Sequence, residues 1–159
     1  MNLKLAAGSV TRLANTTAYA ANDLLANHAT AGSVVPIAIA VARVMGGRGR
    51  ITRAALLKSN AVLTNAQFRI HLFNQAPAVT NGDNGAFAVT NGRAKGYLGS
   101  VDVTVDVAIG DGAQGDAACD IIFDAAAGSL NVYALIEVLA AYGPASAEIF
   151  TIQLDVERP

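Results

Sequence analysis

The sequence has 159 residues, of which 53% are hydrophobic and only 14% are charged, and its formal net charge is −1. A chain of this length fits one domain with a sizeable hydrophobic core, and the near-zero net charge excludes a protein that holds nucleic acid or an anionic membrane by its overall field. The charged fraction is well below the usual quarter, which favours either a surface covered by neighbouring copies or a larger assembly, or simply an alanine-rich surface.

The first third of the chain predicts little regular structure. It begins like a signal peptide, but Gly8 and Ser9 interrupt the apolar stretch before a hydrophobic core develops. Turn formers surround a single aromatic residue, Tyr19, which predicts an arm or a short edge strand. We therefore expect residues 1–33 to be an N-terminal arm and loop that pack on or extend from a β-sandwich domain at 34–159. Such an arm would become ordered on contact with a neighbour.

The longest apolar run covers residues 34–45. It contains Pro36 and Arg43 and is too short to cross a bilayer, so we expect a protein made and, at least at first, kept in the cytoplasm. Large apolar residues alternate with small ones over 35–42, which favours a strand with Pro36 at an edge position. The alanine content of this segment leaves a helix possible.

The middle of the chain combines turn and strand signals. Residues 46–50 are glycine and arginine and predict a turn, and a strand is expected to leave it at 51–59. Over 67–72 apolar and polar residues alternate, so that His71 lies on the polar face of a strand. The polar stretch 74–95 contains the turn signal Asn-Gly-Asp-Asn-Gly at 81–85 and predicts a protruding loop.

The second half shows the clearest β pattern. Residues 97–109 alternate valine or isoleucine with polar or small residues and predict a strand, and a second strand is expected at 119–125. The segment 130–141 is apolar on both faces apart from Asn131 and Glu137. This favours a central strand covered on each side, although the length also allows a helix.

The last segment, 150–157, alternates as a half-buried strand would. Together the segments amount to seven or eight strands with short turns. We therefore expect an all-β fold, a two-sheet antiparallel sandwich or jelly roll with an irregular N-terminal arm.

The best apparent cofactor motif is the glycine-rich stretch 110–115, which follows a predicted strand with dinucleotide-binding spacing. That chemistry requires a helix whose N-terminal amides hold a pyrophosphate. The segment that follows is too short for a crossover helix, and Asp111 and Asp116 would repel phosphate. A hairpin turn is the better interpretation, and we expect no cofactor.

Metal and catalytic sites also find little support. Asp83, with Asn81 and Asn84, offers oxygen atoms that suit calcium. Asp111 and Asp116, in and after the glycine-rich stretch 110–115, do so too. Neither group has the spacing of an EF-hand. The single cysteine, Cys119, lies in an apolar run and is expected to be a buried, inert thiol. A triad built on His71 stays open because triads assemble in space, yet nothing in the sequence favours it, and we do not expect an enzyme.

The one basic cluster surrounds the glycines near residue 47. Flexible glycines would let these arginines fit an acidic protein surface, and a solvated hairpin tip is the alternative interpretation. No aromatic residue is interleaved, which disfavours binding of a single strand of nucleic acid. The candidate contact residues of this cluster are Arg48, Arg50 and Arg53.

Several segments are similar to a family of small tailed-bacteriophage virion proteins, the head decoration (cement) proteins. They are Thr11-Arg12 followed by 16–23, the run 68–77, the loop 83–87 followed by 96–99, and the closing segments 130–136, 142–146 and 150–152. The resemblance covers most of the chain, and its motifs are structural rather than catalytic. It implies a β-sandwich that binds the outside of a capsid as a homo-oligomer, a dimer or trimer.

On this resemblance the expected partner is the major capsid protein and the expected location is the exterior of the virion capsid, after synthesis in the host bacterial cytoplasm. The candidate contact residues in the matching segments are Arg12, Tyr19, Asp83 and Asn84. No nucleic acid and no membrane is expected as a partner. The alternatives are a tail- or fibre-associated virion protein and a carbohydrate-binding β-sandwich for host attachment.

Overall fold

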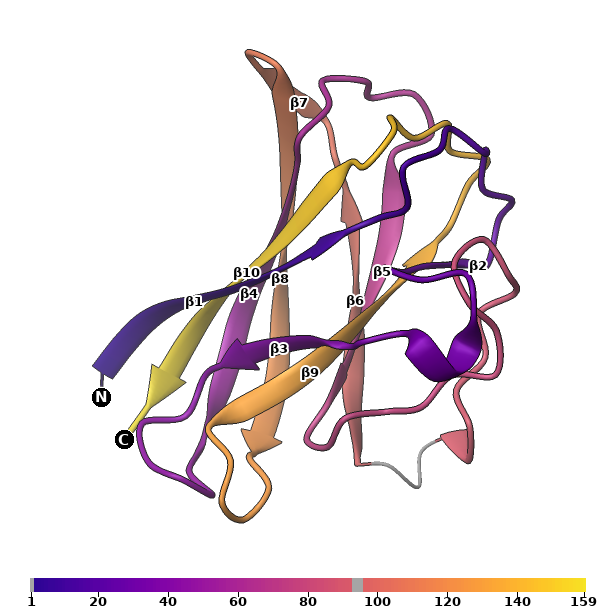
Figure 1. The fold of residues 1–159 in the computed structure, drawn as a ribbon. Coiled ribbons are helices and arrows are strands. Elements are labelled where there is room, and N and C mark those ends of the chain that lie inside the picture. The colour runs from indigo at the N-terminus through magenta and orange to yellow at the C-terminus, as the bar shows by residue number, and fades with distance from the viewer. Residues whose placement is uncertain (1, 93–95) are drawn as a thin grey trace.

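The computed structural model describes residues 2–92 and 96–159, and these fold into two antiparallel β-sheets packed face to face (Figure 1). In spatial order, the first sheet contains β1 (Asn2–Thr11), β10 (Ile149–Arg158), β4 (Arg48–Lys58), β8 (Gly112–Asp124) and β7 (Val107–Ile109). The second contains β2 (Asp23–Leu25), β9 (Asn131–Val138), β5 (Gln67–Phe73) and β6 (Tyr97–Thr104), with β3 (Ile37–Ala40) also paired to β9. The 3₁₀ helix η1 (Ala31–Ser33) precedes β3. The predicted all-β, two-sheet sandwich is confirmed.

The core lies between the sheets and consists of the apolar side chains that alternate along the strands. In β10 the inward residues Phe150, Ile152, Leu154 and Val156 are all fully buried, and the residues between them face outward. Burying each such side chain stabilises the fold by roughly 1.5–3 kcal/mol. Phe150 also packs edge-to-face on Phe68, with ring centroids 5.4 Å apart.

The expected N-terminal arm is instead part of the sandwich. β1 pairs with β10 along its whole length, from Asn2 opposite Arg158 to Thr11 opposite Ile149. Its inward residues are small because β3 crosses beneath it: a Cβ on Gly8 would lie only 2.8 Å from Ile37. The weak alternation of small side chains hides this strand from pattern analysis. Met1, the first residue of the predicted arm, lies outside the described residues.

Three strand boundaries differ from the predicted ones. Residues 48–50 belong to β4 rather than to a turn, and β8 begins at Gly112 inside the predicted glycine-rich turn. The predicted strand 97–109 divides into β6 and β7, which lie in different sheets. The valines before the break, Val101, Val103 and Val105, are buried, whereas Val107 and Ile109 of β7 are 49% and 59% exposed, so the alternation continues in the sequence although the buried face does not. The predicted strands at 35–42 and 130–141 are confirmed as β3 and β9.

The long loop after β5 does not protrude. Its described part, residues 74–92, folds back over the outer face of the second sheet and helps enclose a second apolar cluster. That cluster contains Leu24, Ala26, Phe73, Val79 and Leu135. The last residues of the predicted loop, 93–95, lie outside the described residues. Covering this face explains why Phe73 and Leu135 are apolar although they point away from the main core.

Candidate functional site

Three residues predicted as partner contacts are buried together. The Arg12 Nε donates to the Tyr19 hydroxyl (2.9 Å), which donates to Asp83 Oδ1 (2.6 Å). The Ala26 amide also donates to Asp83 Oδ1 (2.8 Å), and the side chains of Arg12 and Asp83 are 0% and 1% exposed. Burial, followed by the hydrogen bond to Asp83, raises the pKa of Tyr19 above its ordinary value. These side chains join the N-terminal segment to the loop after β5, so contact with a partner, which needs an exposed side chain, is not available to them.

Asn84, next to this cluster, is placed by its backbone. It has a φ of 63°, in the left-handed region that asparagine tolerates better than most residues, and its amide donates to the Leu24 carbonyl (2.9 Å). The residue is partly exposed. Its position serves the turn that carries Asp83 into the buried cluster.

The three predicted arginine contacts lie on the outer face of the first sheet, where each meets an aspartate on a neighbouring strand. The ion pairs are Arg48–Asp124 (3.4 Å), Arg50–Asp120 (2.6 Å), Arg53–Asp155 (2.7 Å) and Arg53–Asp116 (3.5 Å). Such exposed pairs add little stability. The aspartates do neutralise Arg48, Arg50 and Arg53, so these arginines do not produce a broad positive field on this face.

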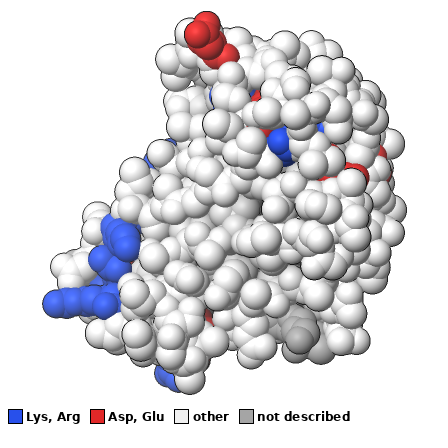
Figure 2. Space-filling view, viewed as in Figure 1, with Lys and Arg blue, Asp and Glu red and all other residues white. Residues whose placement is uncertain are grey.

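The end of the sandwich near both termini presents apolar side chains beside arginine. Val44 and Met45, in the loop between β3 and β4, are 63% and 70% exposed. They adjoin a hollow of about 360 Å³ lined by Arg43, Val44, Gly47, Arg48 and Pro159. Figure 2 shows Lys and Arg gathered at the end of the molecule where Figure 1 places the two termini. We call Arg43, Val44, Met45 and Arg48 the terminal surface.

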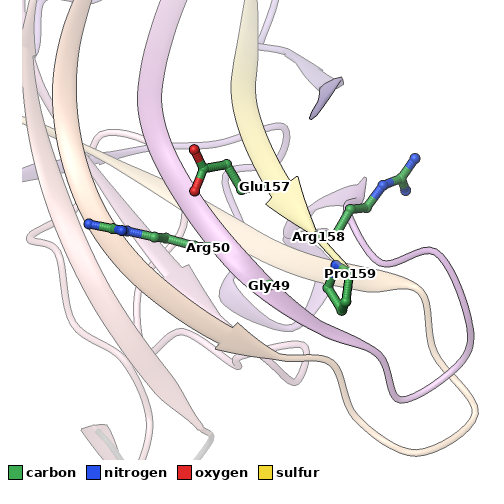
Figure 3. Close-up of a pocket in the computed structure, with 5 residues that line it drawn as sticks. All are labelled: Gly49, Arg50, Glu157, Arg158 and Pro159. Atoms are coloured by element: carbon green, nitrogen blue, oxygen red, sulfur yellow. The ribbon is translucent and has the colours of Figure 1, made fainter. Parts of the chain in front are cut away.

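A second hollow at this end, of about 420 Å³, is lined by Gly49, Arg50, Glu157, Arg158 and Pro159. Figure 3 shows the side chains of Arg50 and Glu157, which are cross-strand partners, on one side and that of Arg158 directed to the other. Arg158 donates to the carbonyls of Val41 and Ala42 (both 3.2 Å) and so holds the end of β3 against β10. The hollow therefore lacks the converging polar groups of a small-molecule site.

Sequence reasoning missed a polar network on the second sheet. His71 Nε2 lies 2.8 Å from Glu137 Oε2, and its Nδ1 lies 3.1 Å from the Tyr97 hydroxyl. Phe87 of the long loop stacks on the His71 ring, with centroids 4.3 Å apart. Burial lowers the pKa of His71. The signal available in the sequence was Glu137, a lone carboxylate in an apolar strand.

This network bears on the open possibility of a triad. Both ring nitrogens of His71 are occupied, one by a carboxylate and one by a phenol. A nucleophile of the serine or cysteine type needs one of those nitrogens as its base. In this arrangement His71 joins strands β5, β9 and β6 under the long loop.

Cys119 is half-buried, and its Sγ lies 3.6 Å from the carbonyl oxygen of Ile51. Burial raises the pKa of the thiol, which keeps it protonated and weakly nucleophilic. Within residues 2–92 and 96–159, no group of three His, Cys, Asp or Glu side chains could hold a metal ion. The described part of the chain also contains no helix long and apolar enough to span a bilayer.

Comparison with known proteins finds no matching family model and no matching curated protein.

Proposed function

We propose that the protein is a structural virion protein that binds the outside of a phage capsid as a homo-oligomer and stabilises the shell. Its partner would be the major capsid protein, which it meets after synthesis in the bacterial cytoplasm. The resemblance of its strand and loop segments to head decoration proteins supports the class of protein. A β-sandwich whose polar side chains mostly pair with one another suits a structural role.

The observation that carries the proposal is the terminal surface. Val44 and Met45 hold apolar side chains in water at a loop tip, with Arg43 and Arg48 beside them. Methionine and arginine are enriched at protein interfaces, where apolar atoms form the centre and charged groups the rim. We propose that Val44 and Met45 enter an apolar depression on the shell and that Arg43 meets an acidic group at its rim, while Arg48 stays paired with Asp124.

The physical mechanism is mass action. A protein that binds only the assembled shell stabilises it by the free energy of binding. Many copies, each linked to others, convert a modest contact into strong overall attachment. A small apolar surface on each copy is sufficient for that purpose.

The test uses purified shells that lack this protein. Adding the wild-type protein should give saturable co-sedimentation and a higher shell melting temperature. The double variant Val44→Ser with Met45→Ser should bind about tenfold more weakly, since two buried apolar side chains are lost. Ile109→Ser is the matched control, because Ile109 is 59% exposed on β7, which pairs with the end of β8 opposite the loop. Equal occupancy of double variant and wild type would contradict the terminal surface, and no binding by wild type would contradict the proposed function.

A carbohydrate-binding role is the second candidate, and one observation favours it. Phe87 and Tyr97 line a hollow of about 320 Å³ together with His71 and Val89, and sugars commonly stack on aromatic rings. A glycan array separates the two candidates: binding that is lost in Phe87→Ala supports this role. Immunogold labelling of virions separates head from tail.

A further inference from the structure

Strand β1 ends the first sheet with a free edge. The Arg12 amide donates to the Glu148 carbonyl (3.1 Å), in register with the β1–β10 pairing. Because hydrogen-bonding direction alternates along an antiparallel strand, even-numbered residues of β1 face β10. The amides and carbonyls of Leu3, Leu5 and Ala7 therefore point away from the sheet. At ten residues, β1 is also the longest edge strand of the described chain.

This edge lacks the usual protection against pairing. Its register with β10 is unbroken from residue 2 to residue 11, so no bulge twists the edge away, and the strand contains no proline. The charged residue, Lys4, has its ammonium bound to the Ala40 carbonyl of β3 (2.8 Å). Leu3 and Leu5 are 79% and 57% exposed. Soluble proteins rarely leave a long, regular, apolar edge of this kind without a partner.

We infer that β1 pairs antiparallel with β1 of a second copy, about a two-fold axis at Leu5. The inference builds on the homo-oligomer of the proposed function and gives it an interface, but it is tested without the shell. The first sheet of one copy and the first sheet of the other, each of five strands, would then form one continuous sheet across the dimer. Main-chain hydrogen bonds supply the affinity in such pairing, and side chains supply the register.

A second copy is the occupant because β1 is complementary to itself. With Leu5 on the axis, Leu5 of one copy faces Leu5 of the other, and Leu3 faces Ala7. The outward-pointing backbone groups of these residues then bond to one another, as an antiparallel pair requires. Lys4 faces Ala6, so no like charges meet. A shift of the axis to Lys4 would place the two ammonium groups opposite each other, which disfavours that register.

The neighbouring strand is compatible with the same register. On β10, Asp155 lies beside Leu5 and Glu157 beside Leu3. Across the axis, Glu157 of one copy is in line with Gln153 of the other, which lies beside Ala7. Glu157 therefore has no acidic residue in its row, and the two Asp155 side chains, which share the row through the axis, are three strand spacings or roughly 14 Å apart, where salt screens their repulsion.

The experiment measures the mass of the full-length protein in solution by native mass spectrometry and light scattering over a range of concentrations. The wild type should be a dimer. Leu5→Lys and Leu5→Glu should each be folded monomers, with a dimer dissociation constant raised about a hundredfold, because the two-fold axis places like charges face to face. An equimolar mixture of the two variants should restore a dimer containing one copy of each.

The control is Ile122→Lys, the same kind of change at a 75% exposed site of the same sheet; it should remain dimeric. Circular dichroism verifies that every variant is folded. A wild-type monomer that binds shells would overturn this inference and the homo-oligomer, and would leave the proposed binding to the shell intact. Variants that still dimerise, or a mixture that stays monomeric, would show that the edge or the register is wrong.

Discussion

Two buried ion pairs connect segments far apart in the chain, Arg12–Asp83 and Lys58–Glu148. All four side chains are at most 1% exposed, and Glu148 also accepts a hydrogen bond from the Tyr142 hydroxyl (2.7 Å). Burial lowers the pKa of Lys58 against the pull of Glu148. Removing one member of such a pair leaves a buried charge alone, which costs about 3–5 kcal/mol. These ion pairs therefore hold segments that are distant in the sequence in fixed positions relative to one another.

His71 should make stability depend on pH. Burial holds its folded-state pKa below the ordinary value of 6.5, while the unfolded chain keeps the ordinary value. As pH falls below about 6.5, the unfolded chain takes up the proton first. The contribution of neutral, buried His71 to the free energy of unfolding is thus complete above about pH 6.5 and is lost as the pH falls towards the folded-state pKa. Denaturant unfolding of wild type should show this fall between pH 7.5 and 5.5.

The comparison variant is His71→Gln, which keeps a hydrogen-bonding side chain toward Glu137 but cannot titrate. Its stability should fall less over the same range. The other groups that face His71, namely Arg69, Tyr97, Asp102 and Glu137, are retained in both proteins. Parallel pH curves for the two proteins would contradict the assignment.

Between elements, close backbone contacts set how the two sheets meet. Gly115 of β8 lies under the end of β6, where a Cβ would come 1.9 Å from the Thr104 carbonyl oxygen. A Cβ on Gly82, in the loop after β5, would likewise come 2.0 Å from the Ala29 carbonyl oxygen. The glycine-rich turn thus serves packing between strands, which agrees with the hairpin interpretation over the cofactor one.

Gly115→Ala should destabilise the protein by about 1–3 kcal/mol, because backbone must move to admit the methyl group. The matched control is Gly143→Ala, since no atom lies within 4 Å of the added Cβ there. Equilibrium unfolding in urea measures both. The same loss of stability in both variants would point to backbone entropy rather than contact as the cause.

Over the whole molecule, the two ends of the chain lie side by side (Figure 1). Asn2 pairs with Arg158 in the first sheet, and β10 lies between β1 and β4. The N-terminal residues are thus as much a part of the sheet as the C-terminal ones. Deleting residues 1–19 would expose the whole edge of β10 and remove Arg12 and Tyr19 from their buried cluster.

This arrangement predicts that a circular permutant will fold. A short glycine linker joins the natural ends, and new ends are opened at the exposed residues Ala127 and Gly128, between β8 and β9. Because the pairing of β1 with β10 is retained, the far-ultraviolet circular dichroism and a cooperative unfolding transition should match those of wild type. Aggregation, or loss of cooperative unfolding, would contradict the role assigned to the paired ends.

By itself, the sequence determined the class of fold and most of the strand faces. Alternation in β5 and β10 is a local property: neighbouring side chains on an extended chain must point to opposite sides, so spacing alone indicates which side is buried. Alternation did not identify β9, because both of its faces are apolar; there the sequence favoured a covered central strand and left a helix open.

Tertiary structure alone decided which strands pair, which edges stay free, and which polar residues are buried. Arg12 and Asp83 are 71 positions apart, and His71 and Glu137 are 66 apart, so no local pattern links them. Arg12, Tyr19 and Asp83 were predicted as surface contacts and became internal, while Val44 and Met45 became the exposed apolar tip. A polar group is buried only where distant segments bring it hydrogen-bond partners, and the local spacing of residues does not indicate which partners those are.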